Sequence, residues 1–409
     1  MKDALDVFVA RAVHANRGDL ASQAGIVYGL LREPTIRNVY VSSYYPHHYA
    51  NMPRVRSVAP PPVRGFLTNS GERPLLRRRM PIFWGGGVDL QDTGSKIKMP
   101  LILLRILLLK RCGSPFVMAF QGAGPVRTRF GRLCLRCIAR RLNLAVCREP
   151  TAQRVLTEQG RLDAQRVRLA TDGALLLDPP NKAFGRRYLA DRGLDPAGLI
   201  LGLNLRRWFH QKSGWLPTQI HRQRRTGELN GPMRALVENI VDTLQDAADL
   251  GYRQIVLLPM YRSEPEPWED DIALLKAVRA RLVDHMRFVL VHEDLSVVQL
   301  ASVFSCLTVM IGVRLHSTIL AHVAGVPAIH VFYEHKGPEH FARLGMSDLL
   351  VGIDEACGSN GGRAILAALN RVHNRLEQTR TQLAQRVQEL RNCAQSHLAD
   401  ALHVIHRAQ

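Results

Sequence analysis

Short apolar runs alternate with longer amphipathic segments along most of this 409-residue chain. The runs are rich in branched side chains, as buried strands are, and the segments between them have helical periodicity. Strands that alternate with helices favour a parallel sheet with helices on its faces. In the first half of the chain, this pattern predicts strands at residues 6–13, 38–42, 81–84, 115–120, 144–147 and 167–170.

A second series of strands and helices follows a connecting segment at residues 179–199. Because the chain exceeds one ordinary domain in length, we predict an α/β fold with two domains, at residues 1–180 and 181–370. A helical segment is predicted at residues 371–409. The strands predicted in the second domain are residues 199–205, 254–258, 288–291, 307–313 and 328–333.

The last predicted helical segment carries Leu376, Leu383 and Leu390 at heptad spacing. We interpret this stripe as a face that packs back against the body of the protein, and a coiled-coil contact between subunits is the alternative. The segment from Lys96 to Lys110 also has the pattern of a helix. Its simplest place is against a sheet, and the alternative is a helix in the plane of a membrane surface.

Two basic segments interrupt the alternation of strands and helices. Residues 51–80 are rich in Pro and Arg and have weak periodicity, which predicts a long loop. Residues 208–234 are basic and contain Gly and Gln, which indicates an insertion rather than a compact crossover between strands. Neither segment identifies a binding partner.

The chain has 55 Lys and Arg against 35 Asp and Glu. This excess of positive charge suits anionic partners, such as phosphorylated metabolites or an anionic membrane surface. Aromatic residues are sparse and no zinc-finger or RNA-binding motif is present, so no nucleic-acid partner is expected. Seven scattered cysteines, with no secretory signal and no run long enough to span a bilayer, predict a cytoplasmic protein. Peripheral contact with the inner face of the membrane and homo-oligomerisation stay open.

Two polar side chains, Arg314 and His316, follow the strand predicted at residues 307–313 and precede a helix. Ligands of open parallel sheets bind beyond the carboxyl ends of the strands. The free N–H groups of a helix start favour an anion, and arginine adds a planar set of donors for a carboxylate or a phosphate. The sequence therefore predicts an anion site here. In the alternative interpretation, Arg314 pairs with a buried acid and His316 caps the helix.

Three consecutive glycines, Gly85, Gly86 and Gly87, follow another predicted strand. Glycine lets the backbone approach a ligand closely, although an ordinary tight turn explains the same residues equally well. The chain has no GxGxxG fingerprint after any predicted strand, which argues against a dinucleotide site.

Several short motifs occur along the chain, namely Asn16-x-Gly18-Asp19, Gly86-Gly87, Gln121-Gly122-x-Gly124-Pro125, Arg148-Glu149, Arg314-Leu315-His316, Gly325-Val326-Pro327 and Tyr333-x-x-Lys336. In their order and spacing, these motifs resemble those of the polysaccharide pyruvyl transferase family. The resemblance covers about residues 6–345, with Glu149 at a position where Asp is commoner. It implies a GT-B-like fold, in which two Rossmann-like domains face each other across a cleft, with a C-terminal helix.

The resemblance also implies an activity, the transfer of a pyruvate unit from phosphoenolpyruvate to a sugar, usually as a ketal across two hydroxyls. The second domain would hold the donor and the first domain the acceptor. Phosphoenolpyruvate is then a co-substrate, and neither a cofactor nor a metal ion is expected. The expected acceptor is a saccharide or a lipid-linked oligosaccharide from an exopolysaccharide, a cell-wall glycan or a glycolipid.

His316 is the first candidate for catalysis, because imidazole changes its protonation near neutral pH and ketal formation needs proton transfers. Its alternative role is to bind phosphate as an imidazolium. Asp19 is either a base for the acceptor hydroxyl or a cap of the first helix. The residues expected at the donor are Arg314, Leu315 through its backbone N–H, His316, Lys336 and one of Arg206 and Arg207. Those expected at the acceptor are Asn16, Gly18, Gly86 and Gly87.

Two other functions fit the same architecture. A GT-B glycosyltransferase would use a sugar nucleotide as its donor. A catalytically silent family member would serve as a scaffold subunit in polysaccharide assembly. Release of phosphate from phosphoenolpyruvate in the presence of a sugar separates the three functions.

Overall fold

The computed structural model of the chain describes residues 4–60, 72–93, 95–207, 229, 231–261, 271–282 and 286–408. Most of the insertion predicted at residues 208–234, and part of the loop predicted at residues 51–80, lie outside the described residues. Within the described ranges, no helix combines the length and the apolar character that crossing a membrane requires.

The first domain contains a parallel sheet with the strand order β3-β2-β1-β4-β6-β7-β8, and β5 pairs with β6. The central strand β6 is buried along its whole length, as expected for a parallel strand covered on both faces. The strands are β1 (Leu5–Val9), β2 (Ile36–Ser42), β3 (Val55–Val58), β4 (Ile82–Gly85), β5 (Val88–Leu90), β6 (Phe116–Ala123), β7 (Leu144–Cys147) and β8 (Val167–Leu169).

The second domain contains a six-stranded parallel sheet with the order β11-β10-β9-β12-β13-β14. Its strands all come after residue 180 and those of the first sheet all come before it, so the chain builds one sheet and then the other. The strands are β9 (Ile200–Asn204), β10 (Gln254–Leu257), β11 (Arg287–Leu290), β12 (Val309–Gly312), β13 (Ala328–Phe332) and β14 (Leu350–Gly352).

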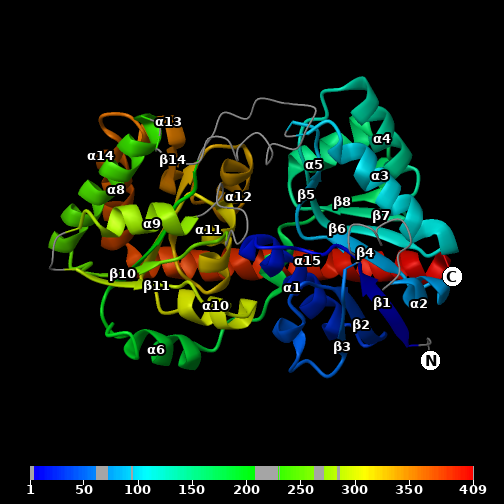
Figure 1. Ribbon diagram of the computed structural model, residues 1–409, viewed down its shortest axis with the longest axis horizontal. Coiled ribbons are helices and arrows are strands. Elements are labelled where there is room, and N and C mark those ends of the chain that lie inside the picture. The colour runs from blue at the N-terminus through cyan, green and yellow to red at the C-terminus, as the bar shows by residue number, and fades with distance from the viewer. Residues whose placement is uncertain are drawn as a thin grey trace.

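Helices cover both sheets (Figure 1). Those of the first domain are α1 (Arg17–Arg32), α2 (Arg73–Arg77), α3 (Lys98–Leu109), α4 (Arg129–Ala139) and α5 (Pro150–Arg154), with the short turns η1 (Pro46–Tyr49), η3 (Lys110–Cys112), η4 (Val155–Gln159), η5 (Ala164–Arg166) and η6 (Gly173–Leu176). Those that follow are α6 (Lys182–Ala190), α8 (Gly231–Asp249), α9 (Asp271–Arg279), α10 (Val297–Phe304), α11 (Leu315–Val323), α12 (Lys336–Leu344), η9 (Ser347–Leu349), α13 (Ile353–Ala356), α14 (Gly361–Asn374) and α15 (Leu376–Ala408).

The predicted α/β architecture is confirmed, with differences at individual elements. The segment 179–199, predicted as a connection, contains α6, and the predicted loop 51–80 contributes β3 and α2. The strand predicted at residues 6–13 ends at Val9, so that Arg11 lies beyond it. Arg11 is thereby placed at the carboxyl edge of the sheet.

The two domains are joined through α1. Leu20, Ala21 and Ala24 of this helix belong to the same hydrophobic cluster as the core of the second domain. The guanidinium of Arg17, a residue only 5% exposed, donates hydrogen bonds to the carbonyls of Pro259, Val291 and Glu293. Because these carbonyls follow β10 and β11, the start of α1 is fixed at the carboxyl edge of the second sheet.

The last helix, α15, crosses the molecule from the second domain to the first (Figure 1). Its first half places Leu383, Val387 and Leu390 in the core of the second domain. Its second half places apolar side chains, including Leu398 and Ile405, in the core of the first domain. The prediction that the leucine stripe packs back against the body of the protein is therefore confirmed.

Candidate active site

A polar cleft of about 270 Å³ lies between the two domains, where the carboxyl ends of the strands of both sheets face each other. Residues that follow β1, β5, β7, β9, β10, β12 and β13 line it. The cleft has more basic than acidic side chains, which suits an anionic ligand. The basic ones are Arg11, Lys98, Arg148, Arg206, Arg314 and Lys336, and the acidic ones are Asp19, Asp89 and Glu334.

His316 belongs to the second domain, but its imidazole lies among side chains of the first. Its Nε2 is 3.2 Å from Asp172 Oδ2, 3.3 Å from Ser22 Oγ and 3.5 Å from Arg148 Nη1. The side chain lines the cleft and is 14% exposed. The interpretation of His316 as a helix cap is wrong, since Arg314 is the N-cap residue of α11 and His316 lies within the helix.

The carboxylate of Asp172 lies within hydrogen-bonding distance of this imidazole. Its buried carboxylate accepts hydrogen bonds from Ser22 Oγ, from Arg148 Nη1 at 2.7 Å and from the Ala174 N–H at 2.9 Å. Burial raises the pKa of the Asp172 carboxyl, but its interactions with His316 and Arg148 outweigh this effect, and the pKa lies well below its ordinary value. The carboxylate therefore stays ionised and fixes the orientation of the ring.

Gly18 provides the space for His316. A Cβ at this position would lie 2.3 Å from the His316 Cβ and 2.5 Å from Nδ1, so any larger residue would displace the imidazole. Gly18 does not appear in the lining of the cleft. Its place in the motif is explained by the close approach of α1 to the start of α11.

Arg314 lines the cleft and is also paired with a buried acid. Its Nε lies 2.8 Å from Asp271 Oδ2, and its Nη2 lies 2.8 Å from Oδ1 of the same carboxylate. The guanidinium also lies over the ring of Tyr261, with its Cζ 5.1 Å from the ring centroid. Both interpretations of Arg314 thus meet in the structure, because the pair with Asp271 fixes the guanidinium in the wall of the cleft.

The other residues expected at the donor also gather here. Leu315 begins α11 and Lys336 begins α12, so the positive ends of two helices face the cleft. Lys336 Nζ lies 2.9 Å from Glu334. Arg206 donates a hydrogen bond to the Tyr333 hydroxyl and lines the cleft, whereas Arg207 does not appear among its lining residues.

The first domain supplies hydrogen-bond acceptors as well as three of the basic side chains of the cleft. Asn16 caps α1, because its Oδ1 accepts from the Gly18 and Asp19 N–H groups. The interpretation of Asp19 as the cap is therefore wrong. Asp19 instead lines the cleft and is paired with Arg11 at 2.9 Å. This pair fixes the Asp19 carboxylate at the edge of the cleft.

The glycine turn after β4 surrounds Arg11. Gly86 has a left-handed backbone with a φ of 83°, and its carbonyl accepts from Arg11 Nη1 at 2.8 Å. A Cβ on Gly87 would lie 2.3 Å from Arg11 Nη2. Arg11 is held further by Asp89, 2.8 Å from its Nε. Gly87 thus makes room for the guanidinium of Arg11 and Gly86 binds it through its carbonyl, roles that the sequence did not reveal.

Three basic residues of the cleft were not among the predicted site residues. Arg11 and Arg148 each follow a strand, so the rule that identified Arg314 also applies to them. Lys98 starts α3, and no strand end marks it in the sequence. Burial lowers the pKa of Lys98 despite the neighbouring charge of Asp89.

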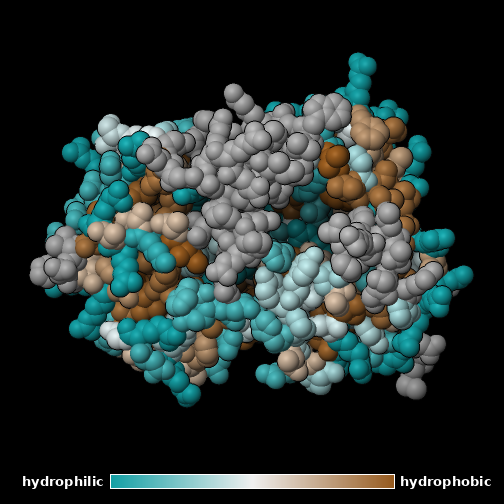
Figure 2. Space-filling view, in the orientation of Figure 1, coloured by the Kyte–Doolittle hydropathy of each residue, from teal (hydrophilic) through white to brown (hydrophobic). Residues whose placement is uncertain are grey.

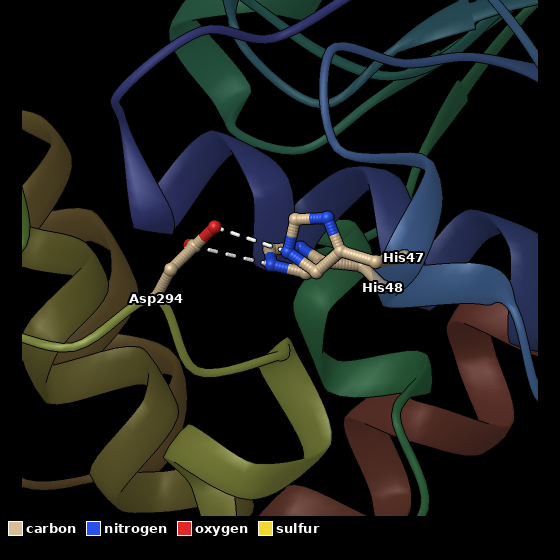
Figure 3. Close-up of side chains that lie close together, drawn as sticks. All are labelled: His47, His48 and Asp294. Carbon is tan, nitrogen blue, oxygen red and sulfur yellow. Dashed lines mark hydrogen bonds and ion pairs between the residues drawn. The ribbon is translucent and has the colours of Figure 1, made fainter.

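A second polar contact between the domains lies outside this cleft (Figure 3). His47 and His48 of η1 both point toward Asp294, which precedes α10. The ring nitrogens Nε2 lie 3.0 Å and 3.4 Å from the two carboxylate oxygens. Burial lowers the pKa of His48, although Asp294 opposes the shift. This group holds the turn η1 against the second domain.

Two parallel-sheet domains that face each other across a basic cleft at their strand ends define a protein of the GT-B fold. Within this class, a sequence model of the family described as polysaccharide pyruvyl transferase matches residues 61–335. This range is more than half of the chain, and the chain belongs to that family.

Solved structures of other proteins share the fold at low sequence identity. UDP-GlcNAc 2-epimerase from Neisseria meningitidis, solved with UDP-GlcNAc, is 12% identical, with a TM-score of 0.58 and coverage of 98% of this chain and 100% of that chain. Anabaena Alr3699/HepE, solved with UDP-glucose, is 9% identical, with a TM-score of 0.57 and coverage of 97% and 99%. At such identities, the similarity shows the fold alone.

Proposed function

We propose that this protein transfers a pyruvate unit from phosphoenolpyruvate to two hydroxyls of a saccharide, closing a ketal in the cleft between its domains. The observation that carries the proposal is the combination, in one cleft, of six basic side chains with an imidazole held by a buried carboxylate. Phosphoenolpyruvate is small and carries a phosphate and a carboxylate. Such a ligand requires several fixed cationic donors, which this cleft provides.

The donor is proposed to bind at the starts of α11 and α12. The first backbone N–H groups of a helix have no acceptor within the helix, so those of Leu315 and His316 can receive a phosphate or a carboxylate. Arg314, Lys336 and Arg206 add positive charge around the same space. Each of these three side chains already has a partner in the protein, which holds it in place before the donor binds.

The reaction needs two sugar hydroxyls and moves two protons. A proton is added to C3 of the enol, and the first hydroxyl attacks C2 as it loses its own proton. The second hydroxyl then displaces phosphate from C2, and its proton leaves with the phosphate. His316 is proposed to carry the proton between the hydroxyl and C3, since its ring lies in the cleft and Asp172 fixes its orientation.

The acceptor is proposed to bind against the first domain. Asp19 and Gln91 line that side of the cleft with oxygen atoms that accept hydrogen bonds from sugar hydroxyls, and Asn16, whose oxygen caps α1, lies beside them. Asp19 is proposed to orient the attacking hydroxyl, because Arg11 fixes its carboxylate at the edge of the cleft. Gly18 and Gly87 serve this arrangement indirectly, by making room for His316 and Arg11.

The test is an acceptor screen with the full chain and phosphoenolpyruvate. We expect phosphate release that depends on a saccharide, together with a mass increase of the glycan by one pyruvate ketal. UDP-sugars serve as the competing donors. Transfer from a UDP-sugar without turnover of phosphoenolpyruvate would show a glycosyltransferase instead. Binding of saccharide without turnover of either donor would indicate a scaffold subunit.

A further inference from the structure

The chain around α3 and α4 is strongly biased in charge. No Asp or Glu occurs between Asp92 and Glu149. Over the same stretch, the chain carries many basic residues, which are Lys96, Lys98, Arg105, Lys110, Arg111, Arg127, Arg129, Arg132, Arg136, Arg140, Arg141 and Arg148. Lys98 and Arg148 line the cleft and Arg105 is buried, so most of the others contribute their charge to the outer surface.

The same two helices expose most of the large apolar side chains that lie on the described surface. Phe130 is 59% exposed, Leu133 54% and Leu101 49%, and Ile97 and Leu107 are also exposed. The other exposed large apolar residues, Tyr44 and Val298, lie elsewhere on the described chain. The helices α3 and α4 pack side by side, and Figure 2 shows apolar residues gathered on this part of the surface among hydrophilic ones.

Helix α3 is apolar on both of its faces. Met99, Ile102, Ile106 and Leu109 are buried in the core of the first domain. On the outer side, Ile97, Leu101, Leu104 and Leu108 follow one another at helical spacing and are exposed or half-buried. A helix that is apolar all round needs an apolar neighbour on its outer side as well.

Helix α4 presents basic and apolar side chains together. Arg129, Arg132, Leu133 and Arg140 share its outer face by their spacing, with Phe130 beside them. The buried side of the helix carries Cys134, Leu135 and Ile138. The outward arginines are thus placed next to the exposed apolar side chains.

We propose that the α3–α4 face, defined by Ile97, Leu101, Leu107, Phe130 and Leu133 with the basic residues Arg127, Arg129, Arg132 and Arg140, docks the protein onto an anionic lipid bilayer. The apolar side chains enter the boundary between headgroups and acyl chains, and the basic side chains contact anionic headgroups. The absence of acids from residue 93 to residue 148 removes the repulsion that such a surface would otherwise impose.

The position of the α3–α4 face indicates which class of acceptor the enzyme uses. This step rests on the proposed function. Lys98, in the first turn of α3, lines the cleft, while Ile97 and Leu101 face outward from the same turns. The cleft therefore opens next to the face that contacts the bilayer. A saccharide attached to a lipid can then reach the acceptor side of the cleft while its lipid stays in the membrane, so the acceptor class is a lipid-linked saccharide.

A lipid surface explains the face better than nucleic acid does. Proteins that bind single strands stack several bases on aromatic side chains, and Phe130 is the only aromatic residue of the α3–α4 face. The remaining apolar members are aliphatic, as in helices that lie at membrane interfaces.

The test measures partition of the full chain onto vesicles of phosphatidylcholine with phosphatidylglycerol, and onto phosphatidylcholine alone, by flotation at several salt concentrations. We expect binding to the anionic vesicles that weakens with salt. The triple variant Arg129→Gln, Arg132→Gln, Arg140→Gln should bind about 100-fold more weakly, at about fivefold for each charge. The triple variant Leu101→Ser, Phe130→Ser, Leu133→Ser should lose at least about tenfold.

Matched controls are Arg375→Gln and Val298→Ser, which remove an exposed charge and an exposed apolar side chain at other places on the surface. They should bind as the wild type does. Equal binding by all variants, or binding to both vesicle types alike, would overturn the proposal. Binding of an oligonucleotide that the arginine variant abolishes, without vesicle binding, would identify the α3–α4 face as a nucleic-acid surface.

Activity with a water-soluble saccharide separates the two proposals. The α3–α4 variants should retain wild-type turnover of such an acceptor, because none of the substituted residues lines the cleft. They should lose turnover only of a lipid-linked acceptor held in vesicles. Vesicle binding without turnover of phosphoenolpyruvate would instead remove the proposed reaction and leave the docking surface standing.

Discussion

The pair of Arg314 and Asp271 decides how the cleft can be tested at single residues. Both side chains are buried, and Asp271 also accepts hydrogen bonds from the Met260 and Tyr261 N–H groups. Removing the arginine alone leaves an uncompensated carboxylate in the core of the second domain. A loss of activity in such a variant would then report on folding as much as on donor binding.

We predict that Arg314→Ala lowers the free energy of unfolding by about 3–5 kcal/mol, because it leaves Asp271 buried without its partner. The double variant Arg314→Gln with Asp271→Asn removes both charges and keeps hydrogen-bonding groups, so it should recover most of that loss. Denaturation with urea checks both values. Equal stability of Arg314→Ala and the wild type would show that the pair contributes little.

In the same double variant, kcat/KM for phosphoenolpyruvate should fall by about 10²-fold or more, since the charge at the donor is lost while the fold is kept. Steady-state kinetics with a fixed saccharide gives this ratio. A double variant with wild-type kinetics would remove Arg314 from the donor site.

We further predict that Asp172→Asn lowers kcat by about 10²-fold with little change in the KM of the donor, because the carboxylate orients His316 without lining the cleft. Asp178→Asn, at an exposed carboxylate paired with Arg32, is the matched control and should be active. An unchanged kcat in Asp172→Asn would show that this carboxylate does not position the imidazole for the reaction.

At this scale the sequence predicted positions better than partners. The rule of strand ends placed Arg314, His316 and Arg206 correctly at the edge of the sheet. It could not reveal that Asp271 pairs with Arg314 or that Asp172 contacts His316. These acids are far away in the chain and are brought to their partners only by packing. Gly18 matched a motif whose physical reason, the close approach of His316, exists only in the folded state.

At the scale of elements, three histidines are packed between α11, β13 and α12. His322 Nδ1 lies 3.0 Å from His340 Nε2, and His330 Nδ1 lies 2.9 Å from the Gly312 carbonyl. Burial lowers the pKa of His330 to about 4 and that of His340 to about 3, and it also lowers the pKa of His322. Near His340, Asp172 opposes this shift, while Arg343, His330 and His316 reinforce it.

These shifts predict a loss of stability in acid. Between pH 6.5 and about pH 4, the unfolded chain binds a proton at each of these imidazoles and the folded chain does not, so the free energy of unfolding falls as the pH falls. Each histidine adds up to about 1.4 kcal/mol per pH unit to the slope. His340→Gln should reduce the slope by one such contribution, and the exposed control His403→Gln should not. Identical slopes in all three proteins would contradict the prediction.

Several elements that the sequence missed bury little apolar surface. β3 and β14 are short strands at sheet edges with few apolar neighbours to impose a pattern, although the other two edge strands, β8 and β11, were predicted. The central strands were found because burial on both faces makes them continuous apolar runs. The helix α6 was missed because only Gly185, Tyr188 and Leu189 of its residues are buried.

At the scale of the whole molecule, the sequence predicted that the chain builds two domains in succession and resembles a known family. It did not predict which residues join the two domains. Contacts between the domains depend on surfaces such as Arg17 against the carbonyls after β10 and β11. An isolated arginine in the first turn of a helix gives no sign of such a contact in the sequence. The sequence likewise predicted that α15 packs against the body of the protein, but not that it contributes to the cores of both domains.

We predict that Leu398→Ala lowers the free energy of unfolding by about 2–5 kcal/mol, because Leu398 is fully buried where α15 packs against Gly29 of α1. Leu376→Ala, at the half-buried start of the same helix, is the matched control and should cost less. Thermal and urea denaturation measure both. A smaller effect at Leu398 than at Leu376 would contradict the assigned packing.

The route of α15 also determines when the first domain can finish folding. Its strands and helices are made before residue 180, yet Ala394, Leu398 and Ile405 of its core are translated after the entire second domain. While the polypeptide emerges from the ribosome, the early sheet therefore carries an uncovered apolar surface. Chaperone binding to nascent chains should accordingly persist until this helix has left the exit tunnel.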